Sequence, residues 1–165
     1  MKILQVRSGM DDEAHEEALN KTGFWGTRGA GVLAFCSSTS RFLVVRRSGN
    51  VEEPLTWGTI GGAIDAHEDP RKAAIREMKE EVGYTGQMRL VPLFIYRSGK
   101  FSYHNFLGIV PREFRPRLDF ENTAAKWCNW LDFPNPRHFG LVALLQDAET
   151  VDVIEDLIGS REERL

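Results

Sequence analysis

The sequence predicts an α/β domain in which a mixed β-sheet carries helices packed on its faces. Runs of β-branched and aromatic residues, each of strand length, fill the middle of the chain. The strongest helix signal, over residues 69–83, lies between those runs, and a second helical pattern occupies residues 136–158 near the end. Strands that alternate with helices in this way are typical of a sheet with helices on it.

The strands are expected in the following order. Residues 29–36 and 41–47 are separated by "SSTS" and predict a β-hairpin. Residues 55–65 read as a strand interrupted by a glycine pair and followed by a turn. The other expected strands are 2–6, 88–98, 101–110 and 125–133, with a short polar helix or ordered loop at 11–19 and one helix or two over 136–158.

Composition restricts the class of protein. With 165 residues and no repeat or linker, the chain is expected to be one domain over 1–165, with an N-terminal extension over 1–25. A formal net charge of −3 argues against a nucleic-acid binder. Cys36 and Cys128 have no CxxC spacing and read as buried thiols. The start of the chain lacks the apolar run of a signal peptide, and no window is apolar enough to span a membrane, so a soluble, cytoplasmic protein is expected.

The helix over residues 69–83 has both ends marked. Asp69 can cap its N-terminus, Pro70 suits the first helical position, and Gly83 suits the position just past the last turn. At about 100° per residue, one side of this helix is apolar and is expected to pack on the sheet. That side holds Ala74, Ile75, Met78 and Val82.

Glu77, Glu80 and Glu81 share another arc of the same helix, where their charges are badly placed. Like charges at i,i+3 and i,i+4 each cost roughly 0.2–0.5 kcal/mol. Glu80 and Glu81 also lie at the negative end of the helix dipole, which adds about 0.3–1 kcal/mol. Arg76 relieves part of this repulsion by facing Glu80 at i,i+4. A solvated charged face and a carboxylate cluster for Mg²⁺ or Mn²⁺ both explain the arc, and the helix alone does not decide between them.

Residues 62–84, "GAIDAHEDPRKAAIREMKEEVGY", decide it. They resemble the Nudix box, G-x5-E-x7-R-E-U-x-E-E-x-G-U, in which U is a bulky aliphatic residue. All fixed positions match, and a chance match in a chain of this length is on the order of one in a million. The fixed residues are Gly62, Glu68, Arg76, Glu77, Glu80, Glu81 and Gly83. Three positions depart from the usual pattern: Ile60 replaces a common proline, His67 a common glycine, and Tyr84 an aliphatic residue.

The resemblance, which covers most of residues 29–145, implies the fold and the chemistry. The fold would be the Nudix-type α/β/α sandwich, with the box helix packed on a mixed sheet. The activity would be hydrolysis of a nucleoside diphosphate linked to another moiety, with metal-assisted attack of water on phosphorus. A pyrophosphate repels a nucleophile until cations neutralise it, and a carboxylate cluster can hold Mg²⁺ or Mn²⁺ for that purpose.

Carried over residue by residue, the resemblance implies a set of roles. Glu77, Glu81 and the backbone carbonyl of Gly61 would be metal ligands, and Glu81 would also count as catalytic. Glu80 would be a further ligand or a general base. Arg76 would orient a box glutamate, and Glu68 would support the ligands from behind, with direct metal contact left open.

Outside the box, the family often supplies another acid from a later loop. Glu121 is the candidate for that catalytic acid, with Glu113 behind it. The candidates for substrate contact are Arg46, Arg47, Arg97 and Tyr103, together with Trp57 and Phe101, for which core packing is the alternative. His67 is read as an exposed loop residue rather than a base.

The box does not select a substrate. A proline associated with ADP-ribose hydrolysis would fall at Gly99 and is absent, and a tyrosine associated with dinucleoside polyphosphates would fall at Phe101. The leading hypothesis is therefore a hydrolase of a nucleotide-type small molecule that acts without a membrane or a stably bound nucleic acid. The alternatives are a nucleotide-sensing or interaction module with little turnover, which the intact box disfavours, and an isomerase of an isoprenoid diphosphate. The resemblance leaves a homodimer open.

Overall fold

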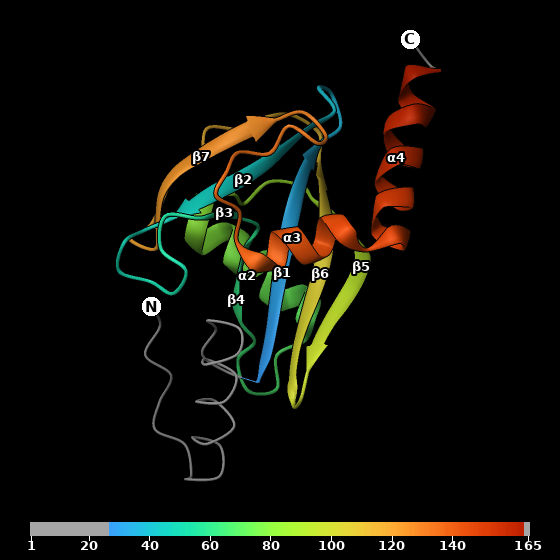
Figure 1. The fold of residues 1–165 in the computed structure, drawn as a ribbon. Coiled ribbons are helices and arrows are strands. Elements are labelled where there is room, and N and C mark those ends of the chain that lie inside the picture. The colour runs from blue at the N-terminus through green and yellow to red at the C-terminus, as the bar shows by residue number, and fades with distance from the viewer. Residues whose placement is uncertain (1–26, 164–165) are drawn as a thin grey trace, which may run out of the picture.

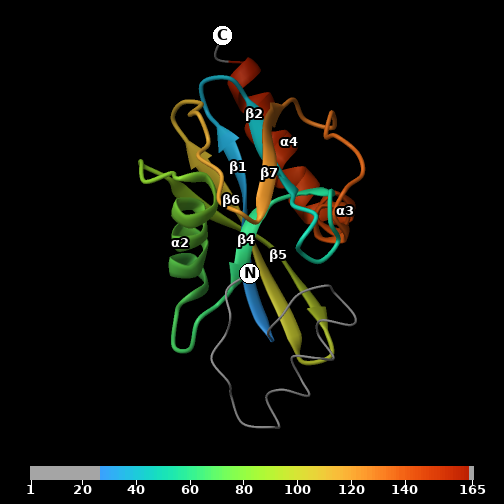
Figure 2. The ribbon, with the colours of Figure 1, turned by 90° about the vertical axis from the view of Figure 1, so that its left-hand side faces the viewer.

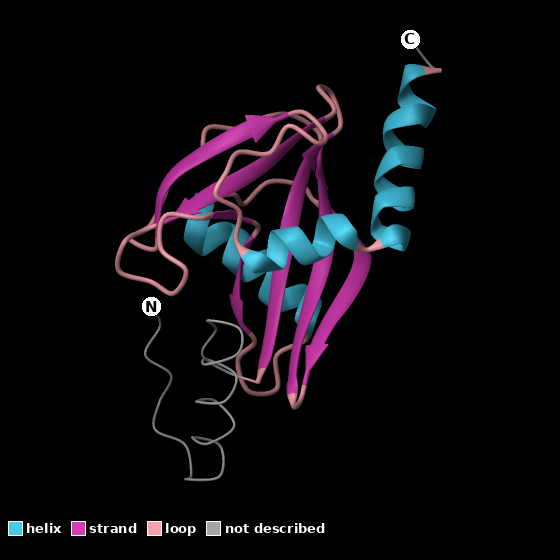
Figure 3. Ribbon diagram, viewed as in Figure 1, coloured by secondary structure: helices cyan, strands magenta, loops and turns pink. Residues whose placement is uncertain are grey.

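A computed structural model describes residues 27–163, so the expected strand 2–6 and the expected helix or loop 11–19 lie outside the described residues. The described part contains a seven-stranded sheet and three helices (Figures 1 and 3). The strands are β1 (Arg28–Cys36), β2 (Arg41–Arg47), β3 (Trp57–Gly58), β4 (Ile60–Ala63), β5 (Arg89–Ser98), β6 (Phe101–Val110) and β7 (Asn122–Cys128). The helices are α2 (Pro70–Val82), α3 (Phe139–Gln146) and α4 (Ala148–Glu162).

The sheet is organised around β1, which has three partners. Its start pairs antiparallel with β4, its end pairs antiparallel with β2, and its whole length pairs parallel with β6. β5 pairs antiparallel with β6, and β2 also pairs with β3 and β7. The parallel β1–β6 pair among antiparallel ones confirms the predicted mixed sheet, and the predicted hairpin of β1 with β2 is present.

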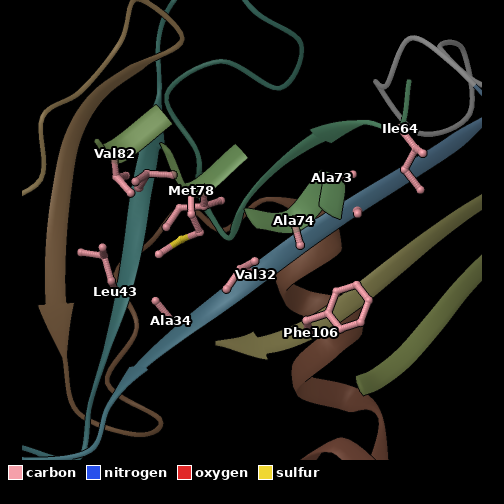
Figure 4. Packing of buried hydrophobic residues seen from close by; sticks show 12 residues of the cluster. Val32, Ala34, Leu43, Ile64, Ala73, Ala74, Met78, Val82 and Phe106 are labelled. Carbon is pink, nitrogen blue, oxygen red and sulfur yellow. The ribbon is translucent and has the colours of Figure 1, made fainter. Parts of the chain in front are cut away.

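Helices cover both faces of the sheet. Figure 2 shows α2 on one side and α3 with α4 on the other. Successive side chains of a strand point to opposite faces, and β1 accordingly sends Val32 toward α2 and Leu33 toward the other helices. Figure 4 shows the first of these two cores, where Met78 and Val82 of α2 lie over Leu43 of β2. This arrangement confirms the α/β/α sandwich.

The apolar side of α2 differs from the expected one at Ile75, whose prediction as a sheet-packing residue is wrong. Its side chain is 53% exposed, and Ala73 is buried instead, beside the expected Ala74, Met78 and Val82. The buried face is thus rotated slightly away from Ile75, and this rotation brings Glu77 and Glu81 into the buried set.

Two other boundaries differ from the prediction, and the C-terminal segment takes one of its two expected forms. The strand expected at 55–65 is split at Thr59 into β3 and β4, and the glycine pair lies within β4 rather than interrupting it. The strand expected at 125–133 spans 122–128. The final helical segment forms two helices because the Asp147 side chain caps α4 by accepting a hydrogen bond from the backbone of Thr150.

Both cysteines are buried and free, as predicted. Among residues 27–163, no helix combines the length and apolarity that crossing a bilayer demands.

Candidate active site

The ends of α2 form as the sequence predicts, and they fix where its glutamates point. Asp69 Oδ1 accepts a hydrogen bond from the backbone of Arg71 at 2.8 Å, and Pro70 begins the helix. Gly83 ends it in the left-handed region with φ 70°, and its N–H bonds back to Lys79. A glycine adopts this conformation without the steric cost that a Cβ would bring. The helix therefore stops directly after the turn that carries Glu81.

Glu77 and Glu81 lie one helical turn apart and are both buried, with 5% and 4% of their surface exposed. Glu77 packs against Gly62 of β4, where a Cβ would lie 2.7 Å from Glu77 Oε1. Any larger residue at position 62 would therefore displace this carboxylate. The first box glycine is needed here for close approach, because it lets the strand touch the acid.

Arg76 ties the loop before α2 to the helix. Its guanidinium donates to both carboxylate oxygens of Glu68, at 2.8 and 2.9 Å, and to Glu77 Oε1 at 2.7 Å. It also donates to the carbonyl of Ala63 at 2.8 Å and to Glu80 Oε2 at 3.2 Å, the i,i+4 contact expected from the sequence. The hydrogen bond with Glu68, with the charge of Glu77 adding to it, raises the pKa of Arg76 against the opposing effect of burial. The arginine thus holds Glu77 and Glu80 in place from one side.

The loop that carries Glu68 contains one of the departures from the box. His67 has φ 63°, in the left-handed region where glycine is favoured and where other residues cost roughly 1–2 kcal/mol. Its side chain is exposed, as expected. Glu68 Oε1 accepts from the backbone of Asp65 at 3.0 Å, which closes the loop beneath it. The ion pair with Arg76 and this loop contact hold the strained residue in place.

Glu81 is surrounded by acids and receives one amide donor. Asn122, the first residue of β7, donates from Nδ2 to Glu81 Oε2 at 2.9 Å. Burial raises the pKa of Glu81, and the negative charges of Glu77, Glu121 and Asp119 raise it further against the hydrogen bond from Asn122. Glu121 therefore stands near enough to Glu81 to repel it, on the loop where the sequence placed a further acid. A cation would lower the energy of this arrangement.

The described residues do not contain a complete metal cage of side chains. Among residues 27–163, no group of three or more His, Cys, Asp or Glu side chains is arranged to hold an ion. Glu80 is more exposed than the buried pair and contacts Arg76. Glu77 and Glu81 are consequently the two side chains best placed as ligands, and any further ligands would come from backbone, substrate or solvent oxygens.

A pocket adjoins Gly61 on the face of β4 that is turned away from Glu77. Tyr103 of β6 reaches this glycine and Gly31 of β1, where a Cβ at either position would overlap its hydroxyl group. Burial and the charges of Glu81 and Glu77 raise the pKa of Tyr103, which places the phenol within the field of the carboxylates. Arg47, Phe101 and Tyr103 line the pocket, and of the expected substrate-contact residues these three are brought together.

The remaining candidates lie elsewhere. Arg97 is exposed, and as the neighbour of Tyr96, which lines the pocket, it points to the other face of β5. Arg46 pairs with Trp57 across β2 and β3, and Trp57 packs partly into the core beneath α3. Glu113 binds Arg41 at 3.2 Å and Thr39 at 2.8 Å, at the turn between β1 and β2.

A family model described as NUDIX domain matches residues 26–147. The chain belongs to the Nudix family. The matched range contains the whole Nudix box and the strands that surround it, in agreement with the resemblance read from the sequence.

Individual relatives agree with the family. An RNA pyrophosphohydrolase from Rhodospirillum rubrum is 31% identical over 112 residues, which are 66% of this chain and 60% of the relative. A putative nudix hydrolase 1 from Caenorhabditis elegans is 32% identical over 77 residues, 46% of this chain but only 21% of the relative. The chain thus spans less than two thirds of the length of both. The solved structure of a Nudix hydrolase from M. smegmatis, RenU, has a TM-score of 0.62 at 24% identity, covers 79% of this chain and 88% of that one, and shares the fold.

Two residues of the candidate site were missed from the sequence. Asn122 follows the candidate acid Glu121, and its polar side chain at the start of a strand was the only signal for it. His138 lines the pocket beside Arg47, and nothing in its sequence context indicated that position. Both are brought to the site by pairing between distant segments, β7 with β2 and the residues before α3 with β3.

Proposed function

We propose that this Nudix protein is a divalent-metal-dependent hydrolase that cleaves a pyrophosphate bond in a nucleoside diphosphate linked to another moiety. The observation that carries the proposal is the buried pair Glu77 and Glu81, held against Gly62 at the end of α2. Two carboxylates that repel each other away from water offer the oxygen ligands that hard cations prefer. This donor set fits Mg²⁺ or Mn²⁺, and Glu77 and Glu81 would hold the ion with the carbonyl oxygen of Gly61.

When bound, the cation supplies positive charge that neutralises the pyrophosphate and favours attack at phosphorus. The residues of the chain prepare that attack. Arg76 fixes the position of Glu77, while Glu68 holds Arg76 in turn. Glu80, at the solvent-facing side of the cluster, accepts the proton of the attacking water as general base. Glu121, whose charge acts on Glu81, is the candidate for a further catalytic acid.

The pocket beside Gly61 receives the rest of the substrate. Arg47 lines it and is the favoured phosphate contact, because its guanidinium is fixed by a hydrogen bond from Nε to the carbonyl of Glu52 and keeps further donors for a ligand. Tyr103 stands between this pocket and the carboxylates. A relative named RNA pyrophosphohydrolase supports a nucleotide-type substrate. Two free, buried thiols support a cytoplasmic location.

A nucleotide panel tests this function. The purified full chain is incubated with nucleoside triphosphates, sugar nucleotides, ADP-ribose and dinucleoside polyphosphates, with Mg²⁺ or with EDTA. We expect release of a nucleoside monophosphate or of pyrophosphate from at least one compound, and loss of that release in EDTA. Binding without turnover of any compound would instead favour the nucleotide-sensing module. Conversion of isopentenyl diphosphate to its isomer would favour the isomerase.

A further inference from the structure

The pocket beside Gly61 contains a buried polar residue that the proposed hydrolysis does not use. Asn105 lies on β6, two residues beyond Tyr103, and is 6% exposed. Its side chain lines the pocket together with Tyr96, Phe101 and His138. Figure 1 shows α3 crossing in front of β1 and β6, and Phe139 and Gly140 at the start of this helix line the pocket.

A β-bulge fixes which way the amide of Asn105 points. The pairing of β5 with β6 shifts between Pro92 and Ile95, so two residues of β5 stand opposite Asn105 alone. Asn105 Nδ2 donates to the carbonyl of Phe94 within this bulge at 3.1 Å. A carbonyl oxygen accepts only from a donor, so the nitrogen must face Phe94 and the oxygen Oδ1 must occupy the other branch. Among residues 27–163, no donor pairs with Oδ1.

The other groups in the pocket suit a flat ring. Phe101 and Tyr103 are stacked with centroids 6.4 Å apart, and Tyr96 meets Phe101 and Phe139 edge to face at 6.3 and 5.8 Å. His138 adds a neutral wall, since its Nδ1 accepts from the backbone of Gly140 at 3.1 Å and cannot carry a proton there. An aromatic enclosure whose Asn105 oxygen receives no hydrogen bond from the described residues suits a planar ligand that donates one.

We propose that this pocket binds an amino-bearing nucleobase, and that Asn105 Oδ1 accepts a hydrogen bond from the exocyclic amine. The inference rests on the proposed function for the identity of the ligand as a nucleotide. An exocyclic amine presents donors only, which matches an acceptor whose own amide nitrogen is already engaged. Uracil and thymine present an N–H flanked by two carbonyl oxygens, and these would face Oδ1 without a donor to satisfy them. Adenine, guanine and cytosine are therefore preferred.

The test compares nucleotides that differ in the amine, using monophosphates, which contain no anhydride to cleave. Calorimetry with Mg²⁺ measures the affinity of the full chain for guanosine and inosine monophosphates, adenosine and purine riboside monophosphates, and cytidine and uridine monophosphates. We expect the amino-bearing member of at least one pair to bind about five- to tenfold more tightly, the effect of one hydrogen bond. Asn105→Leu should abolish that difference. Equal affinities in all three pairs, or a preference that persists in Asn105→Leu, would overturn the proposal.

Two further variants separate recognition from folding. Asn105→Asp removes the donor to the Phe94 carbonyl but keeps an acceptor toward the ligand, so it should keep the preference that Asn105→Leu loses. If Asn105 only satisfies the bulge, the two variants should behave alike, because both lose that donor. His104→Ala is the matched control, because the adjacent residue points to the α2 face with Phe106. Its preference should equal that of the unaltered chain. The affinities are measured without turnover, so this test is independent of hydrolysis. A chain that cleaves no nucleotide would refute the proposed hydrolysis, and the affinity comparison would still decide whether Asn105 recognises the amine.

Discussion

Asn122 donates its side-chain amide to Glu81 at 2.9 Å, and both residues are buried. The first residue of β7 thereby contacts the last turn of α2. The pairing of β7 with β2 shifts between Arg46 and Arg47, and this irregularity sets Asn122 opposite Arg47. The strand that supports the carboxylate is thus also aligned with the arginine that lines the pocket.

Replacing Asn122 with leucine leaves the buried Glu81 without its amide donor, at a cost of about 1–3 kcal/mol. The carboxylate then favours its protonated form, which competes with a cation. We expect Mn²⁺ to bind about tenfold more weakly, measured by electron paramagnetic resonance titration. Thr123→Val, at the exposed neighbouring position, is the control and should bind Mn²⁺ normally. Unchanged Mn²⁺ affinity in Asn122→Leu would show that the amide does not support the ligand.

Arg76→Lys removes the planar guanidinium group that donates hydrogen bonds to Glu68, Glu77 and the carbonyl of Ala63. A lysine cannot reproduce the bidentate contact, so we expect a loss of about 2 kcal/mol in the free energy of unfolding. Urea denaturation measures this loss. Arg71→Lys, on the exposed part of the same helix, should change stability by less than about 0.5 kcal/mol. Equal effects of the two substitutions would argue against the supporting role of Arg76.

Glu121 and Glu113 are the two candidate acids from outside the box, and they have different partners in the structure. Glu121 lies near enough to raise the pKa of Glu81, whereas Glu113 binds Arg41. We expect Glu121→Gln to lower kcat by about tenfold or more if it exchanges protons with the attacking water. Glu113→Gln serves as its control and should keep a normal kcat. The reverse pattern would assign the catalytic acid to Glu113.

His138 makes stability depend on pH. Burial, with the charge of Arg47, lowers its pKa to about 3, although Nε2 lies 3.3 Å from Glu53. The unfolded chain binds a proton at this residue below about pH 6.5, while the folded chain does not until about pH 3. This residue therefore reduces the free energy of unfolding as the pH falls through that window, by up to about 1.4 kcal/mol per pH unit.

His138→Asn isolates this contribution, because asparagine keeps the capping acceptor at the start of α3 and does not titrate. The difference in free energy of unfolding between the variant and the unaltered chain should grow in favour of the variant between pH 6.5 and 4. Denaturation at several pH values measures it. A constant difference would mean that His138 titrates alike in both states.

The sequence predicted what local patterns and the box spacing determine. Asp69, Pro70 and Gly83 set the limits of α2, and Glu77 with Glu81 follow from the box. Ile75 was misassigned because helical spacing alone does not say how the helix is rotated against a sheet. Asn122, Asn105 and His138 were not found because each depends on strand register: a shift in β2–β7, a bulge in β5, or a bridge beside β3. Such irregularities arise from tertiary pairing and leave no period in the sequence.

The most direct measurement is Mg²⁺-dependent turnover of the best nucleotide in the panel by the unaltered chain, by Glu81→Gln and by Glu155→Gln, an exposed acid on α4. Glu81→Gln should lose about two orders of magnitude or more in kcat. Its melting temperature should be equal or higher, since a repulsive buried charge is removed. Glu155→Gln should match the unaltered chain in both respects. Near-normal, Mg²⁺-dependent turnover by a folded Glu81→Gln would contradict a catalytic cation held by the buried pair.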